Sequence, residues 1–357
     1  MKRREGKIPI PLLVFITLVT ILLMFFELNL KHRVKAEFFE EKIAAAELTQ
    51  KCFNEIKQAS DNLNIPIDRI NDPNETGLIG IQYSPITTER GDLNAKLTST
   101  NPNLAALIVK LIKETRIEKG NKVAVSLTGS LPGLNTAVLS TLEILELRPI
   151  IITAAGSSMW GANYPQFTYL DMEQVLYEKG LWGFKTSAAS IGGEDDMGRG
   201  LSPEGREYLM AAIQRNNMDF LAAENLDDAI RKRMDIYRTF GNIKLFINVG
   251  ERNASWIGID PGYGLIPSGH VKQGKGLIAR FSRTGVPVIN LDHISQLAEK
   301  YGLPNAPIPL PDIGKGHLYY EHRYSVTQAV ISLVILLFII FVVLRFDIED
   351  YFRKDKK

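Results

Sequence analysis

Residues 122–169 constrain the fold more than any other stretch of the chain. A short run of alternating apolar residues ends in the polar glycine turn Thr128-Gly129-Ser130. Leucines with helical spacing follow over residues 134–147, and a β-branched run at residues 150–153 then leads into a second polar glycine turn, residues 156–158. This order of strand, turn, helix, strand and turn predicts a βαβ unit within a parallel sheet.

The two polar turns of this unit are expected to lie close together. A right-handed crossover brings the carboxyl ends of both strands to the same edge of the sheet. Open α/β sheets bind ligands at that edge, where helix N-termini present unpaired N–H groups to anions. The candidate ligand-binding residues in the turns are Thr128, Gly129, Ser130, Gly156, Ser157 and Ser158.

Two long apolar segments lie near the ends of the chain. Residues 8–26 and residues 326–344 each run for 19 positions without a charge, which is enough for a helix to cross about 30 Å of hydrocarbon. A cleaved signal peptide is the competing interpretation of the first segment. The residues that follow it are large and charged, unlike a small-residue cleavage site, so an uncleaved anchor is favoured.

The short basic ends of the chain decide the predicted topology. Basic residues cluster before the first apolar segment and after the second, which predicts that both termini lie in the cytoplasm and the main domain lies outside the cytoplasmic (inner) membrane. The expected organisation is a cytoplasmic basic end with the first transmembrane helix at 1–30, a juxtamembrane helix at 31–65, an extracytoplasmic α/β domain at 66–302, a Pro-rich linker at 303–324, the second transmembrane helix at 325–345 and a cytoplasmic tail at 346–357.

Composition argues against several classes of function. Residues 31–324 contain 33 basic and 34 acidic residues, so no overall positive field would recruit nucleic acid. Cys52 is the single cysteine, which leaves no internal disulfide and no thiolate zinc site. The glycine-rich segment 269–276 has Gly276 where a phosphate loop needs Ser or Thr. No metal or cofactor is therefore predicted.

The remaining patterns complete a three-layer α/β domain with a mostly parallel sheet, flanked by an N-terminal and a C-terminal transmembrane helix. Ser202-Pro203 has the form of a helix cap followed by a first-turn proline. The helix at 31–64 is expected to pack on the domain or on a second copy, so a homo-oligomer is possible. Further helices are expected at 104–112, 167–178 and 226–240, and further strands at 78–84, 185–191, 244–250 and 285–291.

Ser130 is a candidate nucleophile at a strand-to-helix turn. The spacing of a nucleophile elbow is absent, because a glycine directly precedes the serine. A serine at such a turn is also a common helix cap. Anion binding by the turn is the third interpretation, and it is favoured over nucleophilic attack.

Acidic residues and a histidine supply the other candidates for catalysis. Asp195 and Asp196 follow Glu194 in a polar loop, and this cluster suits a hard cation or an acid/base pair. A solvated loop before a helix N-terminus explains the same residues. His293 ends a predicted strand beside Asp292, although adjacent residues on a strand point to opposite faces. The candidate catalytic residues are Ser130, Asp195, Asp196 and His293.

Three segments carry a resemblance to a known family. VSLTGSLPGLNTA at 125–137, LRPIII at 147–152 and GSSMWGANYPQFTYLDME at 156–173 resemble the bacterial poly-γ-glutamate system protein family. The resemblance covers most of residues 70–300. It implies a membrane-anchored protein of the machinery that makes, exports or processes poly-γ-glutamate. The synthetase of that machinery is an ATP-dependent ligase, whereas this chain has no credible nucleotide site.

The resemblance suggests ligands and partners. Lys185, Arg199 and Arg252 would supply counter-charge to the carboxylates of the polymer. The expected partners are poly-γ-glutamate, its synthetase and export membrane subunits, and the lipid bilayer. The leading functional prediction is an accessory subunit of poly-γ-glutamate synthesis or export. The alternatives are an extracytoplasmic hydrolase or transferase acting on γ-glutamyl or related amide bonds, and a non-catalytic scaffold for a membrane complex.

Overall fold

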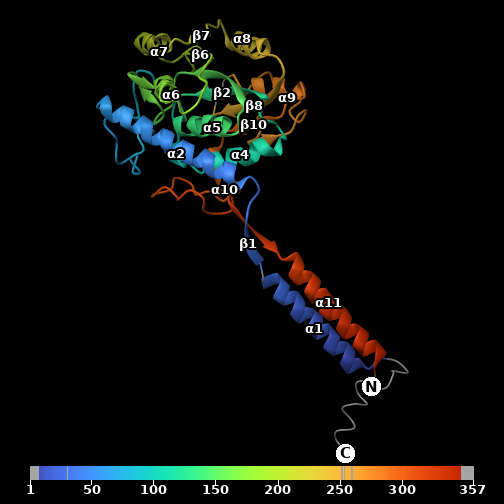
Figure 1. Ribbon diagram of the computed structural model, residues 1–357. Coiled ribbons are helices and arrows are strands. Elements are labelled where there is room, and N and C mark those ends of the chain that lie inside the picture. The colour runs from blue at the N-terminus through green and yellow to red at the C-terminus, as the bar shows by residue number, and fades with distance from the viewer. Residues whose placement is uncertain (1–7, 30, 251, 253, 259, 347–357) are drawn as a thin grey trace, which may run out of the picture. The chain divides into compact units, whose positions relative to one another are not determined.

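The computed structural model describes residues 8–29, 31–250, 252, 254–258 and 260–346 (Figure 1). Apart from Arg345, the basic residues that carry the topology prediction lie outside the described residues, as do Glu251 and Asn253 of the predicted turn after residue 250. The described chain forms two compact units. One is the domain of residues 37–319, and the other joins the two ends of the chain, up to Ala36 and from Tyr320.

A seven-stranded sheet forms the centre of the described domain. Its order is β7-β6-β3-β2-β8-β10-β9, and all neighbouring strands are parallel except β9, which runs antiparallel to β10. The predicted α/β fold with a mostly parallel sheet is therefore confirmed. The strands are β2 (Lys122–Thr128), β3 (Arg148–Ala154), β6 (Ala188–Ser190), β7 (Asp219–Phe220), β8 (Ile243–Val249), β9 (Gly264–Ile266) and β10 (Val288–Leu291).

Helices cover both faces of this sheet. The helices are α2 (Phe39–Asn62), α3 (Leu93–Ser99), α4 (Leu104–Glu114), α5 (Pro132–Ile144), α6 (Tyr169–Glu178), α7 (Pro203–Arg215), α8 (Leu226–Thr239), α9 (Leu277–Arg283) and α10 (Ile294–Lys300). A short hairpin, β4 (Asn163–Tyr164) with β5 (Phe167–Thr168), precedes α6. The predicted cap is confirmed, because the Ser202 hydroxyl accepts a hydrogen bond from Gly205 N at the start of α7.

Alternation along the strands divides the core into two parts. Ala124 and Phe246 point to the face covered by α8 and α9, where the rings of Phe246 and Phe281 stack with their centroids 4.5 Å apart. Val123 and Val125 point to the opposite face, and α2, α4 and α5 pack together on that side (Figure 1). The side chains of these four strand residues are fully buried. Helix, sheet and helix thus make the three predicted layers.

Two of the predicted elements are wrong. The helix expected from residue 31 begins at Phe39, because residues 31–35 form strand β1 (Lys31–Lys35). Apolar helical spacing starts only after Phe38, whose left-handed φ of 58° changes the chain direction. The strand expected over residues 78–84 is irregular, because its partners are a loop and a side chain. Trp160 N donates to Ile81 O at 2.9 Å, and the Asn163 side chain donates to Ile81 O (2.7 Å) and accepts from Ile81 N (3.0 Å).

The two ends of the domain chain lie next to each other. Lys42 Nζ donates to Leu318 O at 2.8 Å, and the rings of Phe39 and Tyr319 meet edge to face with centroids 6.2 Å apart. The proline-rich segment 303–312 is held along the domain by side chains that bond to its backbone. The Asn74 side chain donates to Pro307 O, and the Asn103 side chain donates to Pro311 O and Asp312 O. The Thr98 hydroxyl accepts from Ala306 N.

The second unit is a pair of long apolar helices joined to a β-ribbon. Helices α1 (Ile10–Asn29) and α11 (Val326–Arg345) are exposed along their length and are long and apolar enough to cross a membrane. Figure 1 shows them side by side, and Ser332 Oγ donates to Glu27 Oε1 at 2.6 Å. Strand β1 pairs antiparallel with β11 (Tyr320–Tyr324).

We predict that Glu173 makes the stability of the domain depend on pH. Its carboxyl is buried in α6, accepts a hydrogen bond from Thr186 N at 3.0 Å, and has one oxygen without a partner among the described residues. Burial raises its pKa from 4.5 to about 7. Between these pKa values the folded state binds more protons than the unfolded state, so stability falls as pH rises through this range.

Glu173→Gln removes the charge, so the variant should have a free energy of unfolding roughly 1–3 kcal/mol above that of the native chain at pH 8. The two proteins should converge at pH 5. Urea unfolding of the full chain in detergent, followed by tryptophan fluorescence, measures this difference. Glu178→Gln, on the exposed part of the same helix, is the matched control. A constant difference between Glu173→Gln and the native chain from pH 5 to pH 8 would contradict the prediction.

Candidate active site

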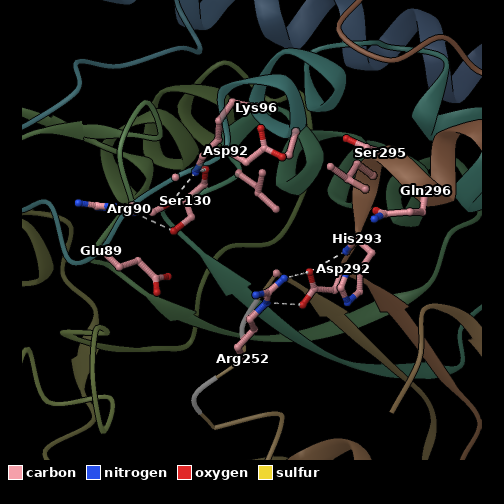
Figure 2. Close-up of a pocket in the computed structure, with 16 residues that line it drawn as sticks. Glu89, Arg90, Asp92, Lys96, Ser130, Arg252, Asp292, His293, Ser295 and Gln296 are labelled. Carbon is pink, nitrogen blue, oxygen red and sulfur yellow. Dashed lines mark hydrogen bonds and ion pairs between the residues drawn. The ribbon is translucent and has the colours of Figure 1, made fainter. Parts of the chain in front are cut away.

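A cavity of about 290 Å³ opens at the carboxyl edge of the sheet. It lies between the neighbouring strands β2 and β8. From this point the strand order runs outward in opposite directions, through β3 on one side and through β10 on the other. Ligand sites of open α/β sheets occur at such points of reversal. The lining residues come from the segment before α3, from α3 itself, from the ends of β2, β3, β8 and β10, and from the start of α10. Figure 2 shows the wall with Lys96 and Ser130 opposite the group of Arg252, Asp292 and His293.

The turns after β2 and β3 meet at one wall of the cavity, as the crossover rule predicts. Ser158 N donates to Ser130 Oγ at 3.0 Å, and the Thr128 hydroxyl donates to the same oxygen at 3.2 Å. The approach depends on Gly129, because a Cβ there would lie 2.7 Å from Ala155 O. Two serine hydroxyls therefore line the cavity from two different turns.

Lys96 of α3 reaches the same wall of the cavity. Its Nζ donates to Ser158 Oγ at 2.7 Å and to Ser130 O, and the residue is only 4% exposed. Burial lowers its pKa from 10.5 to about 7, while the carboxylates of Glu89 and Asp92 oppose that shift. Near neutral pH a large share of this amine is uncharged and able to accept a proton.

The opposite wall is organised by Asp292. Its carboxylate accepts hydrogen bonds from Arg252 Nε at 2.8 Å and Arg252 Nη2 at 2.9 Å, and from His293 N at 2.6 Å. This bidentate pair raises the pKa of Arg252, whose side chain stays 57% exposed. The His293 ring lies 5.8 Å from the Trp256 ring and 5.8 Å from that of Tyr263, measured between centroids.

The candidate catalytic residues Ser130 and His293 line one cavity, but they do not form a triad with Asp292. Both carboxylate oxygens of Asp292 are directed to Arg252 and to the backbone of His293. In the described part of the chain, no hydrogen bond joins Ser130 to the imidazole of His293. Asp292 therefore positions the guanidinium of Arg252 at the cavity, and it does not position the imidazole of His293.

The acidic candidates lie elsewhere. Asp196 is buried and bonded to Arg233 Nη2 at 2.8 Å and to the Ser190 hydroxyl at 2.5 Å. Asp195 forms a surface ion pair with Arg199 at 2.9 Å. None of these residues lines the cavity. The loop folds back on α8, because the guanidinium of Arg233 needs a buried carboxylate as its partner.

Of the remaining predicted ligand-binding residues, some lie at the cavity and one lies away from it. Arg252 and Ser158 line the cavity, and Gly156 and Ser157 lie in the adjoining turn. Lys185 precedes β6 and therefore lies at the amino end of that strand, where its Nζ is 5.6 Å from the Tyr177 ring centroid. Within the described ranges, no three His, Cys, Asp or Glu side chains come together in a way that could hold a metal ion.

Lys96 was not among the residues singled out from the sequence, although it left a signal there. Leu93, Lys96 and Leu97 fall on one face of a helix, so a single cation lies on an otherwise apolar stripe. Arg233 shows the same pattern between Ile230 and Tyr237. Such a cation is buried and needs either a carboxylate partner or a lowered pKa. Arg233 has a carboxylate partner, Asp196, whereas Lys96 has a lowered pKa.

We predict a structural effect of substituting Asp196. Asp196→Asn leaves the fully buried Arg233 without its counter-charge, which should lower the free energy of unfolding by about 3–5 kcal/mol. Asp195→Asn breaks an exposed pair and should cost less than about 1 kcal/mol. Urea unfolding of both full-length variants measures the contrast. Equal stability of the two variants would contradict this assignment and leave Asp196 available for catalysis.

The cavity thus combines two serine hydroxyls, a buried amine of lowered pKa and a bidentate Arg–Asp pair. These groups provide a hydroxyl beside a base at one wall and a cation at the other. Compared with models of protein families, with curated proteins and with solved structures, the chain matches none. The chemistry of the site is therefore interpreted from its own geometry.

Proposed function

We propose that this chain is a membrane-anchored acyl hydrolase or transferase of poly-γ-glutamate production. The observation that carries the proposal is the buried Lys96 amine, which lies 2.7 Å from Ser158 Oγ at the wall of a cavity and has a pKa of about 7. A serine hydroxyl in contact with an amine that is partly uncharged at neutral pH has the arrangement of a nucleophile and its base.

The proposed reaction uses the contacts of these two residues. Ser158 Oγ attacks the carbonyl carbon of an amide, and its proton moves to the uncharged Lys96 amine. The C–N bond then breaks, and the Lys96 ammonium gives the proton to the departing amine nitrogen. Water, or an amine of a second chain, attacks the Ser158 ester and loses a proton through Lys96 to Ser158 Oγ. Hydrolysis yields an acid and an amine, whereas transfer yields a new amide.

The surroundings of Ser158 support stabilisation of the negative charge that develops on the carbonyl oxygen. Helix α5 begins at Pro132, directly after Ser130 and Leu131 at the cavity, and its N-cap residue, Leu131, makes no capping hydrogen bond through its side chain. Its unpaired N–H groups and positive dipole end favour an oxyanion there. The Ser130 hydroxyl, held by Ser158 N and Thr128, is a further hydrogen-bonding group beside the reaction centre.

The resemblance of residues 125–173 to poly-γ-glutamate system proteins suggests the substrate. Each γ-linked residue of that polymer carries an amide bond and a free α-carboxylate. The cavity offers a hydroxyl and a base at one wall, and the half-exposed guanidinium of Arg252 at the other. An arginine of this kind binds carboxylates through charge-assisted hydrogen bonds. The proposed substrate is therefore an amide with a neighbouring carboxylate, as in poly-γ-glutamate.

The proposed setting is the cytoplasmic membrane, with α1 and α11 as the two spans. Both termini would lie in the cytoplasm and the α/β domain outside, where it would meet the polymer and the membrane subunits that make and export it. The exposed apolar surfaces of α1 and α11 support insertion in lipid. The basic ends of the chain support the orientation.

We predict that a fluorophosphonate probe labels Ser158 in the full-length protein, and that the rate of labelling rises with pH around an apparent pKa near 7. Lys96 must lose its proton to act as the base, so protonation below pH 7 should slow the reaction. Lys96→Met and Lys96→Arg should each slow labelling by roughly 100-fold or more.

Lys185→Met, which removes an amine outside the cavity, is the matched control and should label like the native chain. Mass spectrometry identifies the labelled peptide, and urea unfolding confirms that the Lys96 variants are folded. Labelling of Ser130 instead of Ser158 would reverse the assignment of the nucleophile. Labelling that is independent of Lys96 would refute the proposed base.

We also predict that polymer output depends on Ser158. In a strain that makes poly-γ-glutamate with this gene, deletion should change the amount or length of the polymer, and the native gene should restore it. The Ser158→Ala gene should fail to restore it, while the Ser140→Ala gene, altered in the buried part of α5, should succeed. Equal rescue by Ser158→Ala would favour a non-catalytic accessory subunit.

A further inference from the structure

The β-ribbon formed by β1 and β11 separates its charges onto two faces. Side chains alternate between the faces of a strand, and directly paired residues share a face. The antiparallel register therefore assigns six residues to one face: Lys31, Arg33 and Lys35 from β1, with their partners Tyr324, His322 and Tyr320 from β11. This surface is called the cationic face below. It carries three basic side chains, and none of its six residues is a carboxylate.

The opposite face of the ribbon has a different character. It carries His32, Val34, Glu321 and Arg323. Arg323 Nη2 lies 2.9 Å from Glu321 Oε2, so the single constant positive charge of this face is neutralised by a neighbour on the same strand. The ribbon thus has one basic face and one nearly neutral face, although both are exposed.

Aromatic rings lie under the cations of the cationic face. The guanidinium carbon of Arg33 is 3.6 Å from the centroid of the Tyr320 ring, and Lys31 Nζ is 5.0 Å from that of Tyr324. Tyrosine with lysine or arginine is the combination that proteins place at the boundary between hydrocarbon and water.

The ribbon continues directly from the ends of the two apolar helices. Strand β1 starts two residues after Asn29, the last residue of α1, and Tyr324 of β11 is followed by Ser325, the cap of α11. His32 Nε2 lies 3.1 Å from Gln328 Oε1, which ties the ribbon to the first turn of α11. Five residues of strand cover roughly 16 Å, a length that reaches from the edge of the hydrocarbon across the layer of lipid headgroups.

We propose that the cationic face binds the headgroups of anionic phospholipids at the outer surface of the membrane. The inference rests on the membrane insertion of α1 and α11 in the proposed function, and it is independent of the reaction at Ser158. The phosphates accept hydrogen bonds from Arg33 and Lys31, and the ring of Tyr324, next to the start of α11, lies at the level of the lipid glycerol. Lipid binding on this face holds the ribbon, and with it the two ends of the domain chain, at the membrane surface.

The test measures lipid binding to the full-length protein. Native mass spectrometry of the protein purified in detergent, titrated with phosphatidylglycerol or with phosphatidylcholine, gives the two affinities. The native chain should prefer phosphatidylglycerol. A Lys31→Gln, Arg33→Gln variant should lose that preference, with affinity for phosphatidylglycerol about 25-fold lower, at about fivefold for each of the two charges. Arg323→Gln, on the opposite face, is the matched control and should bind like the native chain.

Several results would overturn the inference. Equal affinity of the native chain for the two lipids is one, and an equal loss in Arg323→Gln is another. Binding of soluble poly-L-glutamate through Lys31 and Arg33, without a preference for phosphatidylglycerol, would assign the cationic face to the polymer instead. Extraction of the native chain from membranes by alkaline carbonate would refute the insertion itself, whereas retention without lipid preference would refute only the headgroup site.

Discussion

The contact between the turns that follow β2 and β3 is the constraint on which the site depends. Gly129 N donates to Ala154 O, and Gly129 O accepts a hydrogen bond from Ala162 N, both at 2.9 Å. A side chain at Gly129 would collide with the backbone of the other turn. This close fit brings the serine of each turn to the same wall and creates the polar recess into which the Lys96 amine extends. A looser contact would admit water to the amine and return its pKa toward that of an exposed lysine.

Two buried cations in the domain show how burial leads to different outcomes. Arg233 donates to the hydroxyls of Ser126 and Ser190 and to the carboxylate of Asp196, so its charge is balanced within the protein. Lys96 contacts a hydroxyl and a carbonyl oxygen, while the carboxylates of Glu89 and Asp92 act on it only through space. Arginine keeps its proton under these conditions, and lysine can release it. The pair of Arg233 and Asp196 fixes the loop of residues 192–200. The Lys96 amine, in contrast, can act as a base at the cavity.

Much of the fold followed from local sequence patterns, and the site followed only in part. Residues 122–154 were predictable because alternation, helical spacing and turn residues all indicate the same βαβ unit, and the crossover rule then places Ser130 beside Ser158. Residues 78–84 were not, because the groups that pair with Ile81, the Trp160 backbone and the Asn163 side chain, come from a loop far along the chain. Lys96 was missed for a similar reason: its burial depends on two turns distant in sequence. The acidity of residues 194–196 suggested chemistry, but the partner of Asp196 could be identified only in three dimensions.

The adjacency of the two ends of the domain chain has a mechanical consequence. Residues near Phe39 and near Tyr319 are in contact, so in the order of the chain the whole α/β domain is an insertion between β1 and β11, which pair with each other. A pull on these two strands would load the contact between Lys42 and Leu318 first, and the sheet would carry little of that tension. Because entry and exit coincide, the domain is also a module that could be exchanged for another without changing the ribbon.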